Sequence, residues 1–348
     1  MTEIAVKKRI DYIDIARGAG ILLVVLGHCV SIPEGLNHFV FSVHMPLFFI
    51  LSGFTFSRKN CDDPAGFIKK NVKSLLVPYI ISCVLIILIQ FVKALAAGED
   101  AVYELVKWTV SAIYGTGTHY LDFIPEAGIP ITFIGALWFL LAMFFARIIM
   151  MLVLKTKTPF LWVTASFFLG YVSARKIGWL PFSFQAGMCA VLFLYIGFVI
   201  KEKDLFRWDR VHWILKVLMA LAWIYCFVYC GRLWMVSNTF SDGFLDIIGG
   251  ISGTFVIVYI SLGLEKIGFL RKIFVFLGRI SLGIMCAHTV VLDCWPMSFF
   301  AGKLMNHFGF SYCVSEVLLQ FAVTGVLTAV LFFIPWVNAR LFPAYHNR

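Results

Sequence analysis

Long apolar runs, separated by short polar segments, dominate the chain. Ten of these runs have about 20 residues, the length at which a helix crosses the apolar core of a membrane. They lie near residues 10–31, 37–57, 74–97, 129–153, 159–176, 182–200, 211–234, 244–264, 273–295 and 312–338. The sequence lacks the alternating apolar and polar segments that are typical of a membrane β-barrel. The pattern therefore predicts an all-α, polytopic membrane helical bundle of about ten transmembrane helices, with residues 1–348 as one domain.

The composition supports the same class of protein. Apolar residues make up 61% of the chain and charged residues 14%, whereas soluble domains have about 45–50% and about 25%. A soluble globular fold is excluded, and the lipid bilayer is the expected surrounding of most of the chain.

Lys and Arg fall mainly on one side of this predicted topology. If the N-terminus is cytoplasmic, 22 of the 29 Lys and Arg residues, among them Arg147 and Arg279, belong to the cytoplasmic side. Cytoplasmic loops of membrane proteins carry such an excess, so both termini are expected to be cytoplasmic. The formal net charge of +10 then reflects orientation and contact with anionic lipid. It gives no reason to expect a nucleic-acid partner.

The first apolar run differs from the others because it carries Asp14, Arg17 and His28. Eleven and fourteen residues bring a helix back to nearly the same direction, so these side chains are expected to form one stripe, with roughly 16 Å of helix between Arg17 and His28. Placing an ionisable side chain at membrane depth costs free energy, so such residues usually belong to a functional site. A buried ion pair of Asp14 with Arg17 and a packed histidine is the simpler alternative.

Five motifs follow one another in the sequence. They read DYIDIARGAGILLVVLGH at 11–28, HMPLFFILSGF at 44–54, FIKKNVKSLLVPY at 67–79, GALWFLLAMFF at 135–145 and LGRISLGIMCAH at 277–288. As an ordered set they resemble the integral-membrane acyltransferase-3 family of sugar and polysaccharide O-acetyltransferases, and they look similar to its fucose O-acetylase-like members. The resemblance implies a multi-pass enzyme of the bacterial cell membrane. It would move an acetyl group from cytosolic acetyl-CoA to a hydroxyl of an envelope carbohydrate or another exported acceptor.

His28 is the catalytic candidate that this resemblance implies, because Arg17 and His28 match the family's element of an arginine, ten residues and a histidine. Imidazole can take the proton of a hydroxyl as a general base or carry the acyl group as a nucleophile, and both roles stay open. Asp14 and Arg17 are expected to support it. A carboxylate is expected to orient the histidine. Glu34 is the nearest candidate, with a solvated loop acid as the alternative.

Lys70 and Lys73 match the basic pair that the family places before its third helix. The resemblance implies that they and Arg17 bind acetyl-CoA, whose phosphates suit basic side chains. Without this resemblance, the simpler interpretation of both lysines is that they are cytoplasmic charges that orient the protein in the membrane. No metal is expected, since the sequence has no HExxH motif, and a P-loop is also absent.

Four further residues are candidates for binding the acceptor substrate, namely His44, Trp138, Ser281 and His288. Each could equally pack between helices or form hydrogen bonds there. His119 and Asp122, in the segment between the third and fourth runs, are weaker candidates for contact with a sugar.

Two other classes of function compete with the enzyme. In a proton-coupled secondary transporter of a small molecule, the stripe of Asp14, Arg17 and His28 would be a proton relay. Transporters often contain matching halves, and the chain has no second copy of the Arg17–His28 element. A structural or assembly subunit would not need three ionisable side chains on one helix face.

Overall fold

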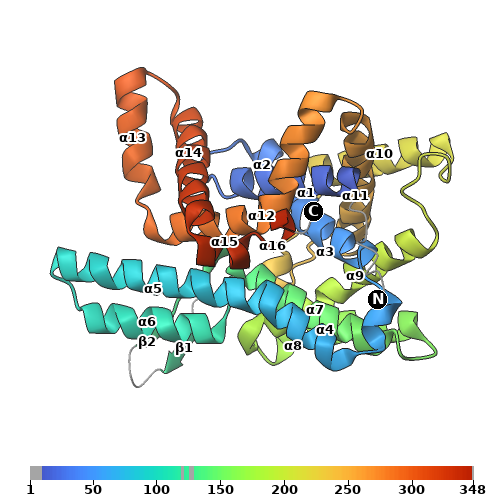
Figure 1. Ribbon diagram of the computed structural model, residues 1–348, viewed down its shortest axis with the longest axis horizontal. Coiled ribbons are helices and arrows are strands. Elements are labelled where there is room, and N and C mark those ends of the chain that lie inside the picture. The colour runs from blue at the N-terminus through green and yellow to red at the C-terminus, as the bar shows by residue number, and fades with distance from the viewer. Residues whose placement is uncertain (1–9, 119–120, 125–128, 347–348) are drawn as a thin grey trace, which may run out of the picture.

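The computed structural model describes residues 10–118, 121–124 and 129–346, and most of them form helices (Figure 1). The α-helices are α1 Asp11–Gly27, α2 Glu34–Phe41, α3 His44–Phe54, α4 Pro64–Asn71, α5 Val77–Ala97, α6 Ala101–Tyr114, α7 Trp138–Val153, α8 Pro159–Lys176, α9 Phe184–Glu202, α10 Trp213–Tyr229, α11 Phe244–Leu264, α12 Gly268–Cys294, α13 Met297–Phe308, α14 Tyr312–Phe333, α15 Pro335–Leu341 and α16 Pro343–His346. Short 3₁₀ or π segments are η1 Arg58–Cys61, η2 Val72–Leu76, η3 Gly135–Leu137, η4 Pro181–Ser183 and η5 Met235–Ser237. The strands β1 Leu121–Ile124 and β2 Ile129–Ile131 form a small antiparallel pair.

The predicted class of an all-α polytopic bundle is confirmed, with the small β1–β2 pair as an addition. Nine of the ten predicted spans coincide with one helix or with two consecutive helices. The predicted start of the span at 129–153 is wrong, because Ile129–Ile131 form β2 and α7 begins at Trp138. Within the described residues, seven helical stretches are long and apolar enough to cross a membrane. The predicted spans outside this group are α1, α8 and the shorter apolar helix α10. The number ten and the cytoplasmic position of both termini stay predictions.

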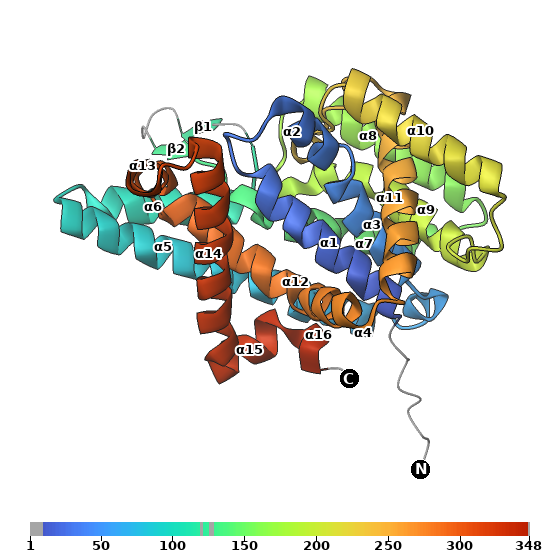
Figure 2. The ribbon, with the colours of Figure 1, turned by 90° about the horizontal axis from the view of Figure 1, so that it is seen from above.

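The contact between α1 and α12 organises the centre of the bundle, and the two helices lie side by side in Figure 2. Gly18 and Gly278 allow this close approach. A Cβ atom on Gly278 would lie 1.8 Å from the carbonyl oxygen of Asp14, and one on Gly18 would lie 2.4 Å from that of Phe274. Small residues let helix backbones meet in membrane proteins. The crossing fixes Asp14 and Arg17 of α1 next to Arg279, the residue after Gly278.

The start of α5 departs from regular α-helical geometry. Between α4 and α5, η2 is a π-helical turn in which the N–H of Val77 donates to the carbonyl of Val72, five residues earlier. Pro78 follows directly and has no N–H to donate. Such π turns occur often at functional sites. Here the widened turn brings Ser74 and Leu75 to the wall of the central cavity.

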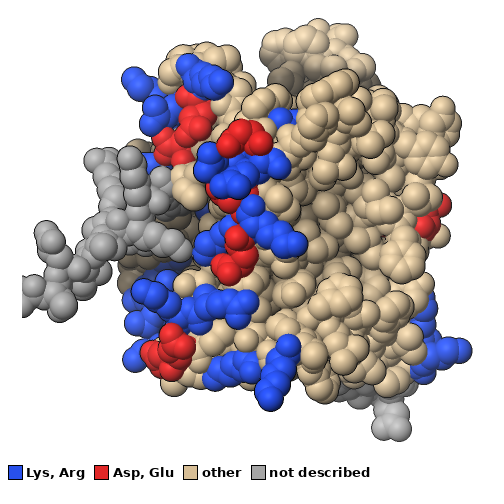
Figure 3. Space-filling model, turned by 90° about the vertical axis from the view of Figure 1, so that its right-hand side faces the viewer, with Lys and Arg blue, Asp and Glu red and all other residues tan. Residues whose placement is uncertain are grey.

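The surface separates into charged edges and an apolar middle. Figure 3 shows Lys and Arg, together with acids, in a band along the left edge of this face, and a broad area without charges between that band and a smaller basic group at the right edge. Many large apolar side chains are exposed on α5, α8, α10 and α14. A soluble protein rarely exposes so much apolar surface, whereas lipid covers it without cost.

Candidate functional site

A cavity of 1210 Å³ lies in the centre of the bundle. It follows α1 from Arg17 and continues past the end of the helix to Val30. Its walls come from α1, α2, α3, α7, α12, α16 and the segments around η2, η3 and η5. Arg17 and His28 both line it, separated by roughly 16 Å along the helix axis. The cavity therefore has an arginine end, near Arg17, and a histidine end, near His28.

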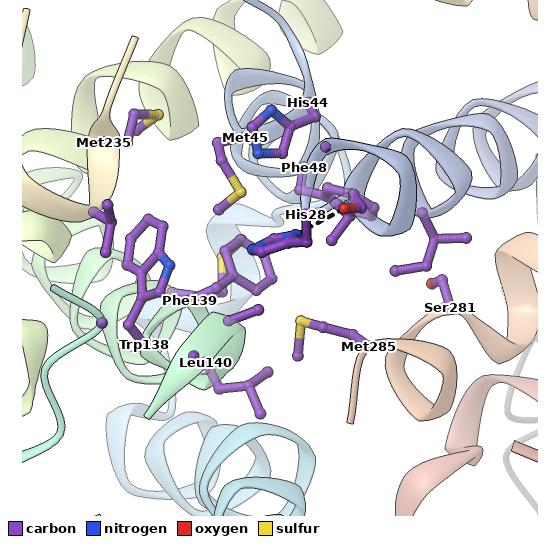
Figure 4. Close-up of a pocket in the computed structure, with 18 of the residues that line it drawn as sticks. His28, His44, Met45, Phe48, Trp138, Phe139, Leu140, Met235, Ser281 and Met285 are labelled. Atoms are coloured by element: carbon purple, nitrogen blue, oxygen red, sulfur yellow. Dashed lines mark hydrogen bonds between the residues drawn. The ribbon is translucent and has the colours of Figure 1, made fainter. Parts of the chain in front are cut away.

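His28 occupies the point where α1 stops. The α-helix ends at Gly27, and His28 is its C-terminal cap, as the Ser, Pro and Gly residues that follow suggest. Figure 4 shows its ring projecting into the cavity, with Trp138 facing it and Met45 and Met285 on either side. The Nδ1 atom lies 2.8 Å from the carbonyl oxygen of Val24. A carbonyl only accepts hydrogen bonds, so Nδ1 carries the proton and Nε2 keeps its lone pair. This is the tautomer that a base or nucleophile needs.

Glu316 of α14 holds the segment that follows His28. Its carboxylate is 4% exposed and accepts hydrogen bonds from the backbone N–H groups of Val30 and Ser31, at 3.1 and 2.9 Å. It also accepts from the Ser31 hydroxyl. These bonds connect α14 to residues far away in sequence and fix where α1 ends.

Glu34, the acid expected from the sequence to orient the histidine, is not brought to the cavity. Its side chain is 78% exposed and pairs with His38 on the same helix, at 3.7 Å. The residue that anchors the His28 segment is Glu316, and it acts on the backbone rather than on the imidazole.

His288 of α12 lies beside His28, with ring centroids 5.0 Å apart in a T-shaped arrangement. It is fully buried, and its Nδ1 atom lies 2.9 Å from the amide nitrogen of Gln320. The amide nitrogen can only donate, so the proton of His288 is on Nε2. Among the described residues this Nε2 has no hydrogen-bond partner. The two histidines thus have opposite tautomers, one presenting a lone pair and the other an N–H.

The arginine end contains a cluster of charges contributed by α1 and α12. Arg17 contacts Asp14 at 3.3 Å, and Arg279 contacts Asp14 at 3.5 Å and Asp11 at 3.9 Å. Arg271 binds Asp11 at 2.5 Å on the outside of the cluster. The expected ion pair of Asp14 with Arg17 is present, and it belongs to a larger network, of which Arg17 and Arg279 line the cavity.

Arg147 of α7 reaches the same end from the opposite wall. Its guanidinium donates to the Ser52 hydroxyl at 3.2 Å and lies over the rings of Phe56 and Phe67, at 5.9 and 5.5 Å from their centroids. Its Nε is buried without a hydrogen-bond partner in the described part of the chain. The sequence placed Arg147 and Arg279 among the cytoplasmic charges, whereas the structure turns both into the cavity.

The histidine end is polar and aromatic. His44 is 3% exposed, and its Nδ1 donates to the carbonyl of Val40 at 2.8 Å. Trp138 and Trp234 line the wall. Asp293 also lines it, close to Gly135.

Two acceptor oxygens at this end have no partner. They are Oδ1 of Asn37 and Oδ2 of Asp293, and both are buried without a hydrogen-bond donor in the ranges that the structure describes. Buried acceptors of this kind are costly unless a ligand or water satisfies them.

The remaining predicted residues divide into two groups. Ser281 lines the cavity, and its hydroxyl donates to the carbonyl of Gly278. Lys70 near the end of α4 and Lys73 within η2 are exposed and do not line the cavity, although Ser74 and Leu75 next to Lys73 do.

Two weaker candidates cannot be placed. His119 lies outside the described residues, and the side chain of Asp122 is not described. In the described ranges, no group of three or more His, Cys, Asp and Glu residues has an arrangement that could hold a metal ion.

Sequence reasoning missed the roles of Arg147, Arg279, Glu316, Gln320 and Asp293. A signal for two of them was present in the last apolar run, where Glu316, Gln320, Thr324 and Thr328 recur every four residues. They form a buried polar stripe on α14. Arg147 gave no such signal because a basic residue near a cytoplasmic end is ordinary.

Comparison with known families agrees with the motifs. No curated protein and no solved structure matches the chain. A family model described as an acyltransferase domain matches residues 10–337, nearly the whole chain. The match includes Arg17 and His28 at the two ends of the cavity, and of the helices that line it only α16 lies beyond the matched residues. The chain therefore belongs to the acyltransferase-3 family and is a multi-pass membrane acyltransferase, rather than the transporter or the assembly subunit that the apolar runs alone also allowed.

Proposed function

We propose that the protein moves an acyl group, acetyl by resemblance, from cytosolic acyl-CoA to a hydroxyl of an envelope carbohydrate or another exported acceptor. The observation that carries this proposal is the geometry of His28. Its Nδ1–H donates a hydrogen bond to the carbonyl of Val24, so the lone pair of Nε2 is available for reaction. The ring lines a cavity that has a basic end and a polar end.

The chemistry follows from this arrangement. As the acceptor hydroxyl attacks the carbonyl carbon of the thioester, Nε2 of His28 takes its proton. A C–O bond forms, the C–S bond breaks, and the proton passes from the imidazolium to the departing thiolate. The Val24 carbonyl keeps its hydrogen bond with Nδ1 throughout, which stabilises the charged ring. If His28 instead attacked the thioester itself, an acyl-imidazole would precede attack by the acceptor.

The histidine end has the features of a site for a polyhydroxylated acceptor. The unpartnered oxygens of Asn37 and Asp293 can accept hydrogen bonds from hydroxyl groups, and Trp138 and Trp234 offer flat apolar faces of the kind that pack against sugar rings. His44 and His288 belong to the same region. Ser281 also lines the cavity, but it lies nearer the arginine end, two residues after Arg279 on α12. We assign the acceptor to the histidine end and the donor thioester to the space between it and Arg17.

The donor enters from the opposite end. Lys70, just before the widened turn η2, and Lys73, within it, are exposed. There they can attract an anionic nucleotide toward the cavity, and Arg17 lies further inside. The pantetheine arm would then follow α1 over the roughly 16 Å that separate Arg17 from His28.

The test uses the purified full-length protein in lipid nanodiscs, with release of free thiol from acetyl-CoA as the readout and a panel of sugars as acceptors. His28→Ala is expected to lower turnover by about 10²–10⁴-fold, as loss of a general base does, while the protein remains folded. Glu34→Gln is the matched control, because Glu34 is exposed and outside the cavity. Turnover of His28→Ala close to that of the unmodified protein would move the chemistry to another residue. Acid-quenched protein that retains the acetyl group would identify His28 as the acyl carrier.

A further inference from the structure

Arg147 is an unusual residue for the interior of a membrane protein. It lines the cavity and has no ion pair with an acid of the described residues. Its known partners are one hydroxyl and two aromatic rings, and its Nε is buried and unsatisfied. A guanidinium in such a place is costly unless an anion joins it.

The neighbours of Arg147 increase this cost. Arg17 lies close enough for its positive charge to act on Arg147, and Arg279 lines the same end of the cavity. The acids of this cluster, Asp11 and Asp14, form ion pairs with Arg17, Arg271 and Arg279. Four arginines and two aspartates leave an excess of two positive charges.

We propose that Arg147 and Arg279, together with Arg17, form an anion site inside the cavity that holds a phosphate group of the acyl donor. The inference rests on the proposed function, and it places the main binding site for the donor's phosphate at the arginines inside the cavity rather than at the lysines on the surface. The exposed Lys70 and Lys73 would attract the donor to the surface of the protein, whereas one of its phosphate groups would enter the bundle and bind the arginines. Guanidinium groups suit this role because they bind phosphate through two parallel hydrogen bonds.

The geometry of the cavity supports the assignment. The three arginines come from three helices, α1, α7 and α12, and all lie at one end of a cavity whose other end holds His28. A phosphate held there directs the rest of the donor along α1. The site would therefore set the depth at which the thioester stops.

The test compares two donors, acetyl-CoA and acetyl-pantetheine, which carries the same thioester and arm without phosphates. Arg147→Met is expected to raise KM for acetyl-CoA roughly tenfold to a hundredfold, the effect of one charged hydrogen bond, and to leave KM for acetyl-pantetheine unchanged. Arg147→Lys should give a KM for acetyl-CoA between those of the unmodified protein and Arg147→Met. Lys155→Met, just beyond the end of α7 and exposed, removes the same charge and should change neither constant. An equal rise for both donors, or no rise for either, would overturn the proposal.

Thermal unfolding provides a second measurement that does not depend on turnover. Without donor, Arg147→Met should unfold at the same or a higher temperature, because an unpaired buried charge is removed. The rise in unfolding temperature that coenzyme A causes in the unmodified protein should be lost. A lower unfolding temperature without donor would show that Arg147 is a structural residue. If coenzyme A stabilises the protein through Arg147 but no acceptor releases thiol, the anion site stands and the proposed reaction fails.

Discussion

Glu316 offers the sharpest test of how the fold positions His28. Replacing it with alanine removes the acceptor for two backbone N–H groups, of Val30 and Ser31, and for the Ser31 hydroxyl. Val30 is exposed, whereas Ser31, which supplies the other two donors, is half-buried. Each unsatisfied buried donor costs about 1–3 kcal/mol, so Glu316→Ala should lose roughly 2–6 kcal/mol, a large part of the 5–15 kcal/mol that stabilises a typical fold. Glu316→Gln keeps one acceptor oxygen and should lose about 1–3 kcal/mol.

The effect on catalysis separates positioning from mere stability. In Glu316→Gln the segment after α1 is held less firmly, so His28 no longer has a fixed place at the helix end. This variant should lower kcat by roughly tenfold or more, which corresponds to an increase of about 1.4 kcal/mol or more in the activation free energy. KM for the donor should stay unchanged, because the arginine end is distant. The assays are thermal unfolding in detergent and thiol release with varied acetyl-CoA.

Glu34→Gln is the matched control for this experiment, since Glu34 is an exposed acid a few residues away. It should change neither stability nor turnover. If Glu316→Gln unfolds at the same temperature as the unmodified protein and turns over at the same rate, the argument that this carboxylate holds the catalytic segment is wrong.

Two further predictions concern packing and topology. Gly278→Ala should destabilise the protein by about 1–3 kcal/mol or more through overpacking, because its Cβ would lie 1.8 Å from a carbonyl of α1. By contrast, Gly263→Ala, with no atom within 4 Å of its Cβ, should be neutral or slightly stabilising in the same unfolding measurement. Reporter fusions placed after Gly117 and after Asp204 should be external and cytoplasmic, respectively, and a cytoplasmic reporter at Gly117 would refute the predicted orientation.

Local patterns in the sequence predicted most helices of this fold. Apolar runs and charge asymmetry depend on the bilayer alone, so they identify the spans without knowledge of their neighbours. The stripe of Arg17 and His28 on α1 was also local, and the structure places both in one cavity.

Residues whose role depends on contact between distant helices could not be foreseen. Glu316 meets Ser31 across 285 positions, and no periodicity encodes that pairing. From the sequence, Arg147 and Arg279 resemble ordinary charged residues of the cytoplasmic side. Their side chains line the cavity because of the crossing of α1 with α12 and the position of α7. Glu34 was the candidate for orienting His28 because it is near His28 in sequence. The chain turns after α1, so the Glu34 side chain lies on the surface, away from the imidazole.

The three arginines at one end of the cavity also bear on the permeability of the membrane. A cavity that follows a transmembrane helix is a route by which protons and sodium ions could leak. Fixed positive charge along such a path raises the electrostatic barrier for cations, as arginine does in water-selective pores. Arg17, Arg147 and Arg279 would thus allow a long anionic molecule to enter while the membrane keeps its ion gradients.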